Sequence, residues 1–222
     1  MHLTALQSLL IGMIVVSSLA FLSVCKRDSV ARLMLKPLTT LLITLLAASF
    51  IDQLSGPFQS AALLITAGLI FSLAGDIFLQ LQTKWFRFGL ASFLIAHLAY
   101  ICAIGMPGGS APFIGGHWIA AAIALCGLVA IYTPMHRHLA RERVPVALYA
   151  VVIAALLFVT LLQWLNGGSL ILLVGVILFS ISDSLLAANR FVRPWPSAQY
   201  QVMSTYYSAQ LLIALSLAEL TG

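Results

Sequence analysis

Two aspartates stand inside long apolar stretches of this sequence, each eight residues after a glycine. Asp76 follows Gly68 in the run GLIFSLAGD, and Asp183 follows Gly175 in the run GVILFSISD. A carboxylate inside a membrane-length helix costs about 3 kcal/mol even on lenient insertion scales. Asn or Ser would join neighbouring helices at lower cost. We therefore expect Asp76 and Asp183 to be catalytic, although a purely structural bond between helices remains the simpler alternative.

Paired carboxyl groups can divide acid and base chemistry between them. In glycoside hydrolysis one carboxylic acid donates a proton, and an ionised carboxylate stabilises the positive charge that develops. Two acids in one apolar site tend to keep one proton between them, so this division needs no metal. Zinc hydrolysis of the three-histidine type lacks ligands, because His97 has no partner at metal-ligand spacing. We expect no metal and no cofactor.

Seven further polar residues are predicted to lie near the two acids and to bind the substrate: Lys36, His97, Tyr149, Asn189, Arg190, Tyr207 and Gln210. Lys36 either extends toward the lipid headgroups or pairs with a carboxylate or a phosphate, and the sequence leaves both open. Arg190 closes an apolar run at the membrane surface, where it is well placed for a phosphate. Tyr207 and Gln210 share a helix face, so Tyr206 is expected to point elsewhere.

The composition indicates which elements must position these residues. Of the 222 residues, 62% are hydrophobic and only 8% are charged. A soluble domain carries about a quarter charged residues, so this chain is a polytopic membrane protein. Its net charge of +5 comes from short loops beside apolar runs, which is typical of membrane topology and does not indicate nucleic-acid binding.

Eight apolar runs have the length, about 18–22 residues, that crosses a hydrocarbon core. We predict transmembrane helices near residues 4–24, 33–51, 60–81, 88–105, 116–133, 144–162, 168–188 and 199–220. Turn-forming residues separate them, for example at 55–57 and 166–168. The fold class is therefore an all-α membrane protein, a bundle of eight transmembrane helices, with a single domain over residues 1–222.

The basic residues predict the orientation of this bundle. All eleven lie in or beside the odd-numbered connections: Lys26, Arg27, Arg32, Lys36, Lys84, Arg87, Arg137, Arg141, Arg143, Arg190 and Arg193. The positive-inside rule places those connections in the cytoplasm and both termini outside. At 1.5 Å per residue, Asp76 and Asp183 then lie about 10–12 Å from the cytoplasmic boundary. We expect a multi-pass protein of the bacterial inner membrane with its site in the cytoplasmic half.

The spacing of the two acids is also consistent with an internal sequence repeat, which the sequence alone does not establish. Asp76 and Asp183 are 107 positions apart, while Pro37 and Pro145, each expected to open a helix, are 108 apart. Four helices plus four would make a parallel duplication of the kind that some transporters show.

Four segments together resemble one known family. They are GDIFL at 75–79, HLAYI at 97–101, ISDSLLAANRF at 181–191 and YYSAQLLI at 206–213. In order and in predicted helix, they are similar to the YhhN, or lysoplasmalogenase-like, membrane family from about Lys36 to the end of the chain. The resemblance implies a membrane hydrolase that cleaves the vinyl ether bond of a lysoplasmalogen. The products would be a fatty aldehyde and glycerophosphocholine or glycerophosphoethanolamine, with Asp76 and Asp183 as the paired acids.

Vinyl ether hydrolysis begins with protonation of the carbon distal to the oxygen, which leaves an oxocarbenium ion for water to attack. We expect Asp183 to be the acid and Asp76 the anion. Lys36, Arg190 and Tyr207 would hold the phosphate or glycerol of the lysophospholipid, and its chain would lie among apolar side chains and membrane lipids.

Two other functions fit some of the same residues. A proton-coupled small-molecule or lipid transporter also uses paired intramembrane aspartates and internal repeats. Against it, the polar residues cluster in one half of the membrane rather than lining a path to both sides. A lipid-binding scaffold gives no reason for two buried acids, and the oligomeric state is left open.

Overall fold

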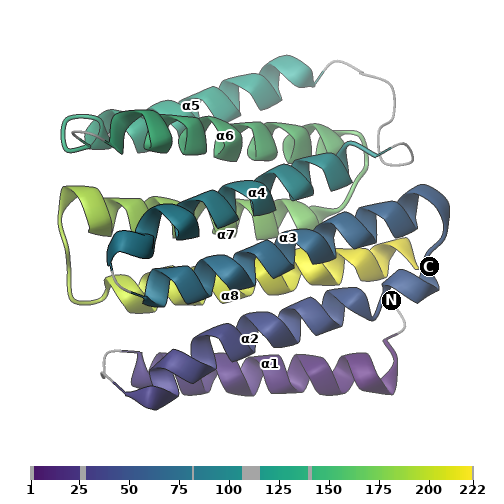
Figure 1. Ribbon diagram of the computed structural model, residues 1–222. Helices are drawn as coiled ribbons and strands as arrows, with labels where there is room; N and C mark the ends of the chain where they lie inside the picture. The colour runs from purple at the N-terminus through teal and green to yellow at the C-terminus, as the bar shows by residue number, and fades with distance from the viewer. Residues whose placement is uncertain (1–2, 26–28, 82, 107–115, 140–141, 222) are drawn as a thin grey trace.

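The computed structural model describes residues 3–25, 29–81, 83–106, 116–139 and 142–221. These residues are helical and contain no strand, which confirms the all-α fold class. The long helices are α1 (Ala5–Val24), α2 (Val30–Ala48), α3 (Gly56–Gln80), α4 (Phe86–Ile104), α5 (His117–Met135), α6 (Arg143–Leu165), α7 (Leu170–Ala187) and α8 (Ala198–Leu215) (Figure 1). Short helical turns follow or precede four of them, at Ile51–Gln53, Thr83–Trp85, Ala188–Val192 and Ser216–Leu220.

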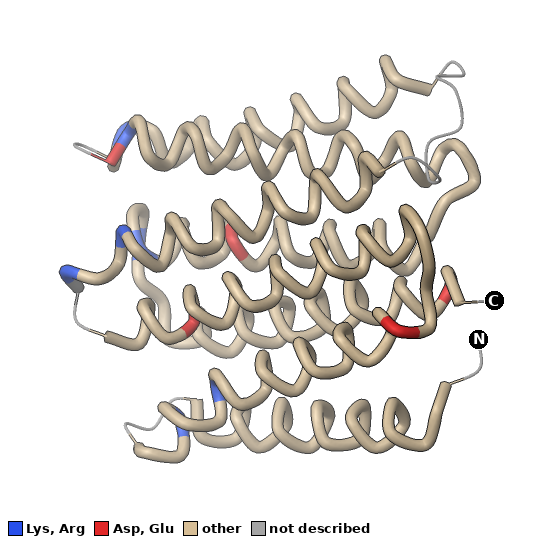
Figure 2. Tube along the Cα trace, turned by 45° about the vertical axis from the view of Figure 1, so that its right-hand side comes forward, with Lys and Arg blue, Asp and Glu red and all other residues tan. Residues whose placement is uncertain are grey.

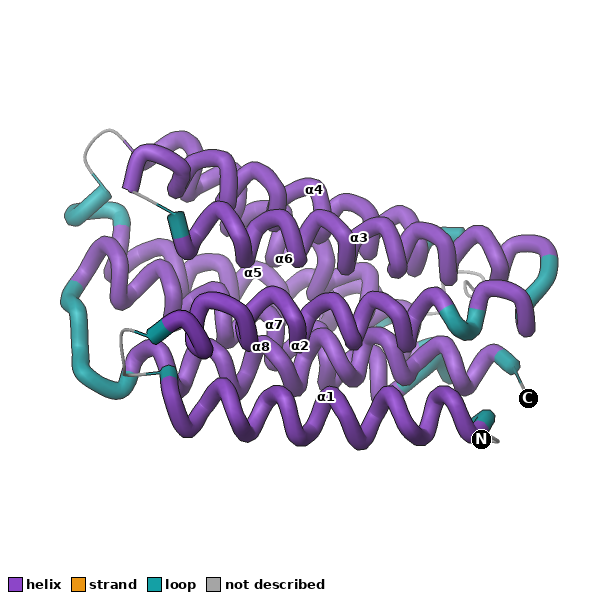
Figure 3. Tube along the Cα trace, turned by 60° about the horizontal axis from the view of Figure 1, so that its bottom comes forward, coloured by secondary structure: helices purple, strands orange, loops and turns teal. Residues whose placement is uncertain are grey.

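The helices lie side by side along one direction, and the described loops lie at the two ends of the bundle (Figure 3). Both termini lie at the same end (Figure 1). The described Lys and Arg residues gather at the opposite end (Figure 2), which we call the basic end. This separation agrees with the alternation of loop charges in the sequence. The predicted cytoplasmic loops Lys26–Arg27 and Arg141 lie outside the described residues.

Seven of these helices, α1 to α7, are long and apolar enough to cross a membrane, within the part of the chain that the structure describes. Helix α8 is not among the seven, since its first three turns carry Gln, Ser, Thr and Tyr side chains. It nevertheless packs against α7, α2, α1 and α3 inside the bundle. The protein is thus a multi-pass membrane protein whose most polar helix is held by four others.

Local sequence explains where several helices begin. Thr4 caps α1 in a reciprocal pair with Gln7, and Ser29 and Ser169 accept hydrogen bonds from the first turns of α2 and α7. The expected start at Pro37 is wrong, because α2 begins at Val30 and contains Pro37 in its interior. The capping Ser29 determines where α2 begins. Pro37 leaves one backbone carbonyl of the helix without its usual N–H donor, and neighbouring helices can compensate for this inside a membrane bundle.

Candidate active site

Asp76 on α3 is surrounded by hydrogen-bond donors. Its Oδ1 lies 3.1 Å from the Lys36 Nζ. Its Oδ2 accepts hydrogen bonds from the Thr40 hydroxyl at 2.6 Å and from the Tyr206 hydroxyl at 2.9 Å. Three donors, one of them a cation, are what an ionised carboxylate requires when it is only 1% exposed.

Two neighbouring helices supply these donors. Lys36 and Thr40 are four residues apart, so they share the face of α2 that packs on α3. Lys36 is only 7% exposed. A buried ammonium group is expensive unless it is paired, so its contact with Asp76 answers the question that the sequence left open. In this structure Lys36 pairs with a carboxylate rather than extending to the membrane surface.

Asp183 on α7 has different neighbours. Its Oδ2 accepts a hydrogen bond of 2.5 Å from the Tyr149 hydroxyl of α6 and lies 3.3 Å from the Nε2 of His97 on α4. That second contact lacks the alignment of a hydrogen bond, and Nε2 has no other hydrogen-bond partner among the described residues. The Nδ1 atom of His97 lies 2.7 Å from the Phe93 carbonyl oxygen. The imidazole also stacks on the Phe179 ring, with centroids 4.4 Å apart.

Both aspartates line one cavity of about 260 Å³, whose lining also includes Arg32 and Arg190 at the basic end of the bundle. Its polar lining also includes Arg32, Lys36, Gln80, Asn189, Arg190 and Gln199. Its apolar lining comes from Phe21 and Phe93, among others. The two acids therefore reach the same space from helices that are far apart in sequence, each with a different set of partners.

Arg190 and Asn189 line this cavity beyond the end of α7. The Arg190 guanidinium lies 4.8 Å from the centroid of the Phe86 ring, and Asn189 Oδ1 accepts a hydrogen bond from the Trp195 backbone. The π-helical turn Ala188–Val192 carries both residues. Single π-type turns are often found at functional sites, and here one ends the helix that bears Asp183.

Two of the seven residues expected to bind substrate make other contacts. The Tyr207 hydroxyl donates a long hydrogen bond of 3.5 Å to the Lys36 carbonyl oxygen. Gln210 accepts a hydrogen bond from Tyr100 at 2.8 Å and donates one to Ser72 at 3.1 Å. Neither lines the cavity, and nor do His97 and Tyr149, which contact Asp183 instead.

The structure adds two residues that sequence reasoning missed, Thr40 and Tyr206. The expectation that Tyr206 points elsewhere is wrong, since it donates to Asp76 and lines the cavity. The available signals were the four-residue spacings, Lys36 to Thr40 and Tyr206 to Gln210, which place each pair on one helix face.

The glycines that precede the two acids allow close packing of helices. A Cβ atom on Gly68 would collide with the Tyr100 ring. A Cβ atom on Gly175 would lie 3.0 Å from Ile213 Cγ1 and 3.2 Å from the Ala209 carbonyl oxygen. Gly68 thus brings α4 close to α3, and Gly175 brings α8 close to α7. In each case the glycine allows a neighbouring helix to approach closely the helix that carries the aspartate eight residues later.

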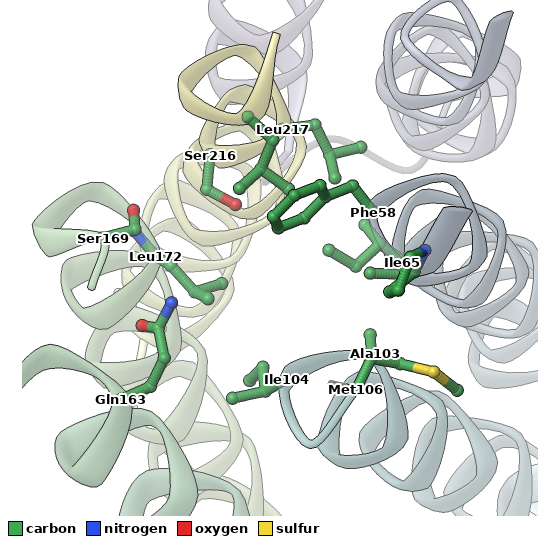
Figure 4. Close-up of a pocket in the computed structure, with 13 residues that line it drawn as sticks. Phe58, Ile65, Ala103, Ile104, Met106, Gln163, Ser169, Leu172, Ser216 and Leu217 are labelled. Carbon is green, nitrogen blue, oxygen red and sulfur yellow. The ribbon is translucent and has the colours of Figure 1, made fainter. Parts of the chain in front are cut away.

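A second cavity, of about 60 Å³, lies between the ends of α3, α4, α6 and α7 and the turn Ser216–Leu220 that follows α8 (Figure 4). Phe58, Leu172 and Leu217 line it together with the polar Gln163 and Ser169. None of its lining residues is charged. Among the described residues, no group of three or more His, Cys, Asp or Glu side chains is arranged to hold a metal ion. Asp76 and Asp183 line the cavity toward the basic end and not this one.

Several known proteins are similar to this chain in sequence. A human protein named lysoplasmalogenase TMEM86B is 34% identical over 154 residues, which cover 69% of this chain and 62% of that protein. A Mycobacterium tuberculosis protein named lysoplasmalogenase is 31% identical over 158 residues, 67% of this chain and 58% of its own length. The chain thus spans less than two thirds of the length of both relatives.

No solved structure matches the chain. The model of the YhhN family matches residues 31–217, a range that contains both aspartates, all their partners and helices α3 to α8. This match confirms the family predicted from the four sequence segments: the protein belongs to the YhhN family.

Proposed function

We propose that this protein hydrolyses the vinyl ether bond of lysoplasmalogens, releasing a fatty aldehyde and glycerophosphocholine or glycerophosphoethanolamine. The observation that carries the proposal is that Asp76 and Asp183 line one cavity, one beside a lysine and the other beside a histidine. The names of the relatives support the same activity. The reaction is R–CH=CH–O–R′ + H₂O giving R–CH₂–CHO + HO–R′, so it needs a proton donor and a positioned water and no redox partner.

Asp183 and His97 form the proton donor in this proposal. The Phe93 carbonyl oxygen can only accept, so the Nδ1 that faces it carries a proton. In a neutral imidazole Nε2 then presents a lone pair to Asp183. The two atoms lie 3.3 Å apart, so a small rotation of either side chain would let them share a proton. In this proposal that proton is transferred from Asp183 to the distal vinyl carbon.

Asp76 is the anion in this proposal. Lys36, Thr40 and Tyr206 all favour its ionised form. When the vinyl carbon is protonated, positive charge develops on the adjacent carbon and the ether oxygen, and a fixed carboxylate stabilises that charge. Water then adds to the oxocarbenium carbon and loses a proton to a carboxylate. Collapse of the hemiacetal returns a proton to the leaving glycerol oxygen and yields the aldehyde.

The headgroup belongs at the outer part of the cavity, toward the basic end. Arg190 is exposed there, and a guanidinium group binds phosphate oxygens through paired hydrogen bonds. By the positive-inside rule the basic end faces the cytoplasm. We therefore propose a site in the cytoplasmic half of a bacterial inner membrane, with a single-chain phospholipid as substrate.

Purified protein in detergent tests this function. With a long-chain alkenyl lysophospholipid, we expect stoichiometric release of aldehyde and glycerophosphodiester, and no release from the matching alkyl ether, acyl ester or ceramide. A proton-coupled transporter would release no aldehyde and would move a solute only across sealed vesicles. Absence of aldehyde with both choline and ethanolamine headgroups would reject the hydrolase.

A further inference from the structure

Asp183 lies at the boundary between two cavities of opposite character. One is the polar cavity that it shares with Asp76. The other is a narrow space of about 30 Å³, which we call the apolar slot, lined by Phe86, Leu90, Phe93, Val146, Leu186 and Phe191 with Asp183 and the Tyr149 side chain at its inner end. Asp76 is not among the residues of the slot. Only one of the two acids therefore faces both spaces.

The apolar slot runs from the buried acid toward the side of the bundle. Phe93, Val146 and Tyr149 at its inner part are buried, whereas Phe86, Leu90, Leu186 and Phe191 are half-buried. Neighbouring apolar residues on α4 and α6 point out of the bundle, since Phe88 is 56% and Val144 69% exposed. Past the cytoplasmic end of the slot, Arg87 and Glu142 join α4 to the start of α6 by an ion pair of 2.6 Å. The slot thus lies between the first turns of α4 and α6 and the last turn of α7, with exposed apolar side chains of α4 and α6 beside it.

We propose that the apolar slot binds the first carbons of the alkenyl chain, which leaves the bundle laterally between α4 and α6. This inference rests on the proposed hydrolase function. A lysophospholipid has a charged half and an uncharged half that meet at the ether oxygen. The charged half fits the polar cavity, because the exposed Arg190 that lines it can compensate the phosphate. The uncharged half fits the slot, whose side chains offer it no polar partner except at Asp183 and Tyr149.

This arrangement assigns the roles of the two acids by position. The carbon that receives the proton lies on the chain side of the ether oxygen, so it lies beside Asp183 and His97. The glycerol carbons lie on the other side, toward Asp76 and Lys36. The slot is also much smaller than the polar cavity, at about 30 Å³ against about 260 Å³. Rim side chains must move to admit even one chain, and a second chain has no place.

A pair of variants on α6 tests the slot. Val146→Phe fills it, and Val144→Phe places the same ring two residues away on the lipid-facing side. Two substrates report the result, a long-chain alkenyl lysophospholipid and its short propenyl analogue. We expect Val146→Phe to lower kcat/KM for the long-chain substrate at least tenfold more than for the propenyl analogue. Val144→Phe should leave the ratio unchanged. An equal effect of Val146→Phe on both substrates overturns the proposal.

Photolabelling of the unaltered protein decides the question without any variant, even if Val146→Phe does not fold. The probe is a non-hydrolysable alkyl ether lysophospholipid with a diazirine on the fourth chain carbon. Labels within 86–93 of α4 and 143–149 of α6 support the slot. Labels confined to other helices reject it. If no vinyl ether lipid is hydrolysed but the label still falls in α4 and α6, the hydrolase proposal fails while lateral chain binding stands.

Discussion

The Nε2 atom of His97 and the Oδ2 atom of Asp183 lie 3.3 Å apart, joining α4 to α7 at the inner wall of the cavity. The other imidazole nitrogen is held by the Phe93 carbonyl oxygen, and the ring is stacked on Phe179. The histidine is thus fixed in orientation by its own helix and by an aromatic neighbour. Its second nitrogen lies beside the acid that borders the apolar slot.

Replacing His97 should reduce catalysis more than substrate binding. His97→Gln removes the group that shares a proton with Asp183, so we expect kcat for aldehyde release to fall by about 10²–10⁴-fold. The KM should change by less than about threefold, since His97 is not among the residues that line the polar cavity. His138→Gln is the control, because His138 is exposed after α5. Unchanged kcat in His97→Gln would exclude the histidine from proton transfer.

The Lys36–Asp76 pair predicts a coupled effect on stability. Lys36→Met leaves a buried carboxylate without its cation, which typically costs about 3–5 kcal/mol. The double variant Lys36→Met with Asp76→Asn removes both charges, so its free energy of unfolding should return most of the way to the original value. Neither protein should release aldehyde. Unfolding in mixed detergent micelles measures the cycle, and a double variant that is less stable than Lys36→Met contradicts the pairing.

The two adjacent tyrosines of α8 should differ sharply. Tyr206→Phe removes a hydrogen bond to an ionised group, worth about 1.5–3 kcal/mol, so we expect kcat to fall roughly 10- to 100-fold. Tyr207→Phe removes only a 3.5 Å contact with a backbone carbonyl and should change kcat by less than twofold. Steady-state kinetics of the pair check this order. The opposite order would favour Tyr207, rather than Tyr206, as the tyrosine that acts at the site.

Glycine packing between α3 and α4 predicts another difference in stability. Gly68→Ala places a methyl group against the buried Tyr100 ring and should lower the free energy of unfolding by about 1–3 kcal/mol. Gly12→Ala is the matched control in α1, where no atom lies within 4 Å of the added carbon. We expect that control to be neutral or to stabilise by up to about 1 kcal/mol. If the two substitutions behave alike, Gly68 is not needed for the close approach of α4.

The sequence predicted the helices well because a membrane helix must satisfy its backbone internally over a fixed length. The predicted runs near 60–81 and 168–188 correspond to α3 and α7, which carry the acids. The error at Pro37 came from treating a proline as a helix start, whereas Ser29 caps the helix eight residues earlier. Apolar length decides that a helix exists, but caps decide where it begins.

The candidate site was only partly predictable. Buried acids stand out in an apolar sequence, so Asp76 and Asp183 could be found. Lys36 was recognisable as a basic residue at the cytoplasmic start of a predicted helix, close in depth to the two acids. Thr40 and Tyr206 were not singled out, because hydroxyl groups are common in membrane helices and their value depends on which helix packs opposite. The apolar slot was not predictable either, since it depends on contacts among α3, α4, α6 and α7.

The most direct test of the two-aspartate mechanism is aldehyde release from a long-chain alkenyl lysophospholipid by Asp76→Asn and Asp183→Asn, with Asp52→Asn as the control at the opposite end of the bundle. Each substitution keeps the shape of its side chain and removes one ionisable group. We predict that both site variants fold, bind the non-hydrolysable alkyl ether and lose at least about 10³-fold in kcat, on the order expected for loss of an acid–base group, while Asp52→Asn retains full activity. Retention of most activity by either site variant would contradict the mechanism.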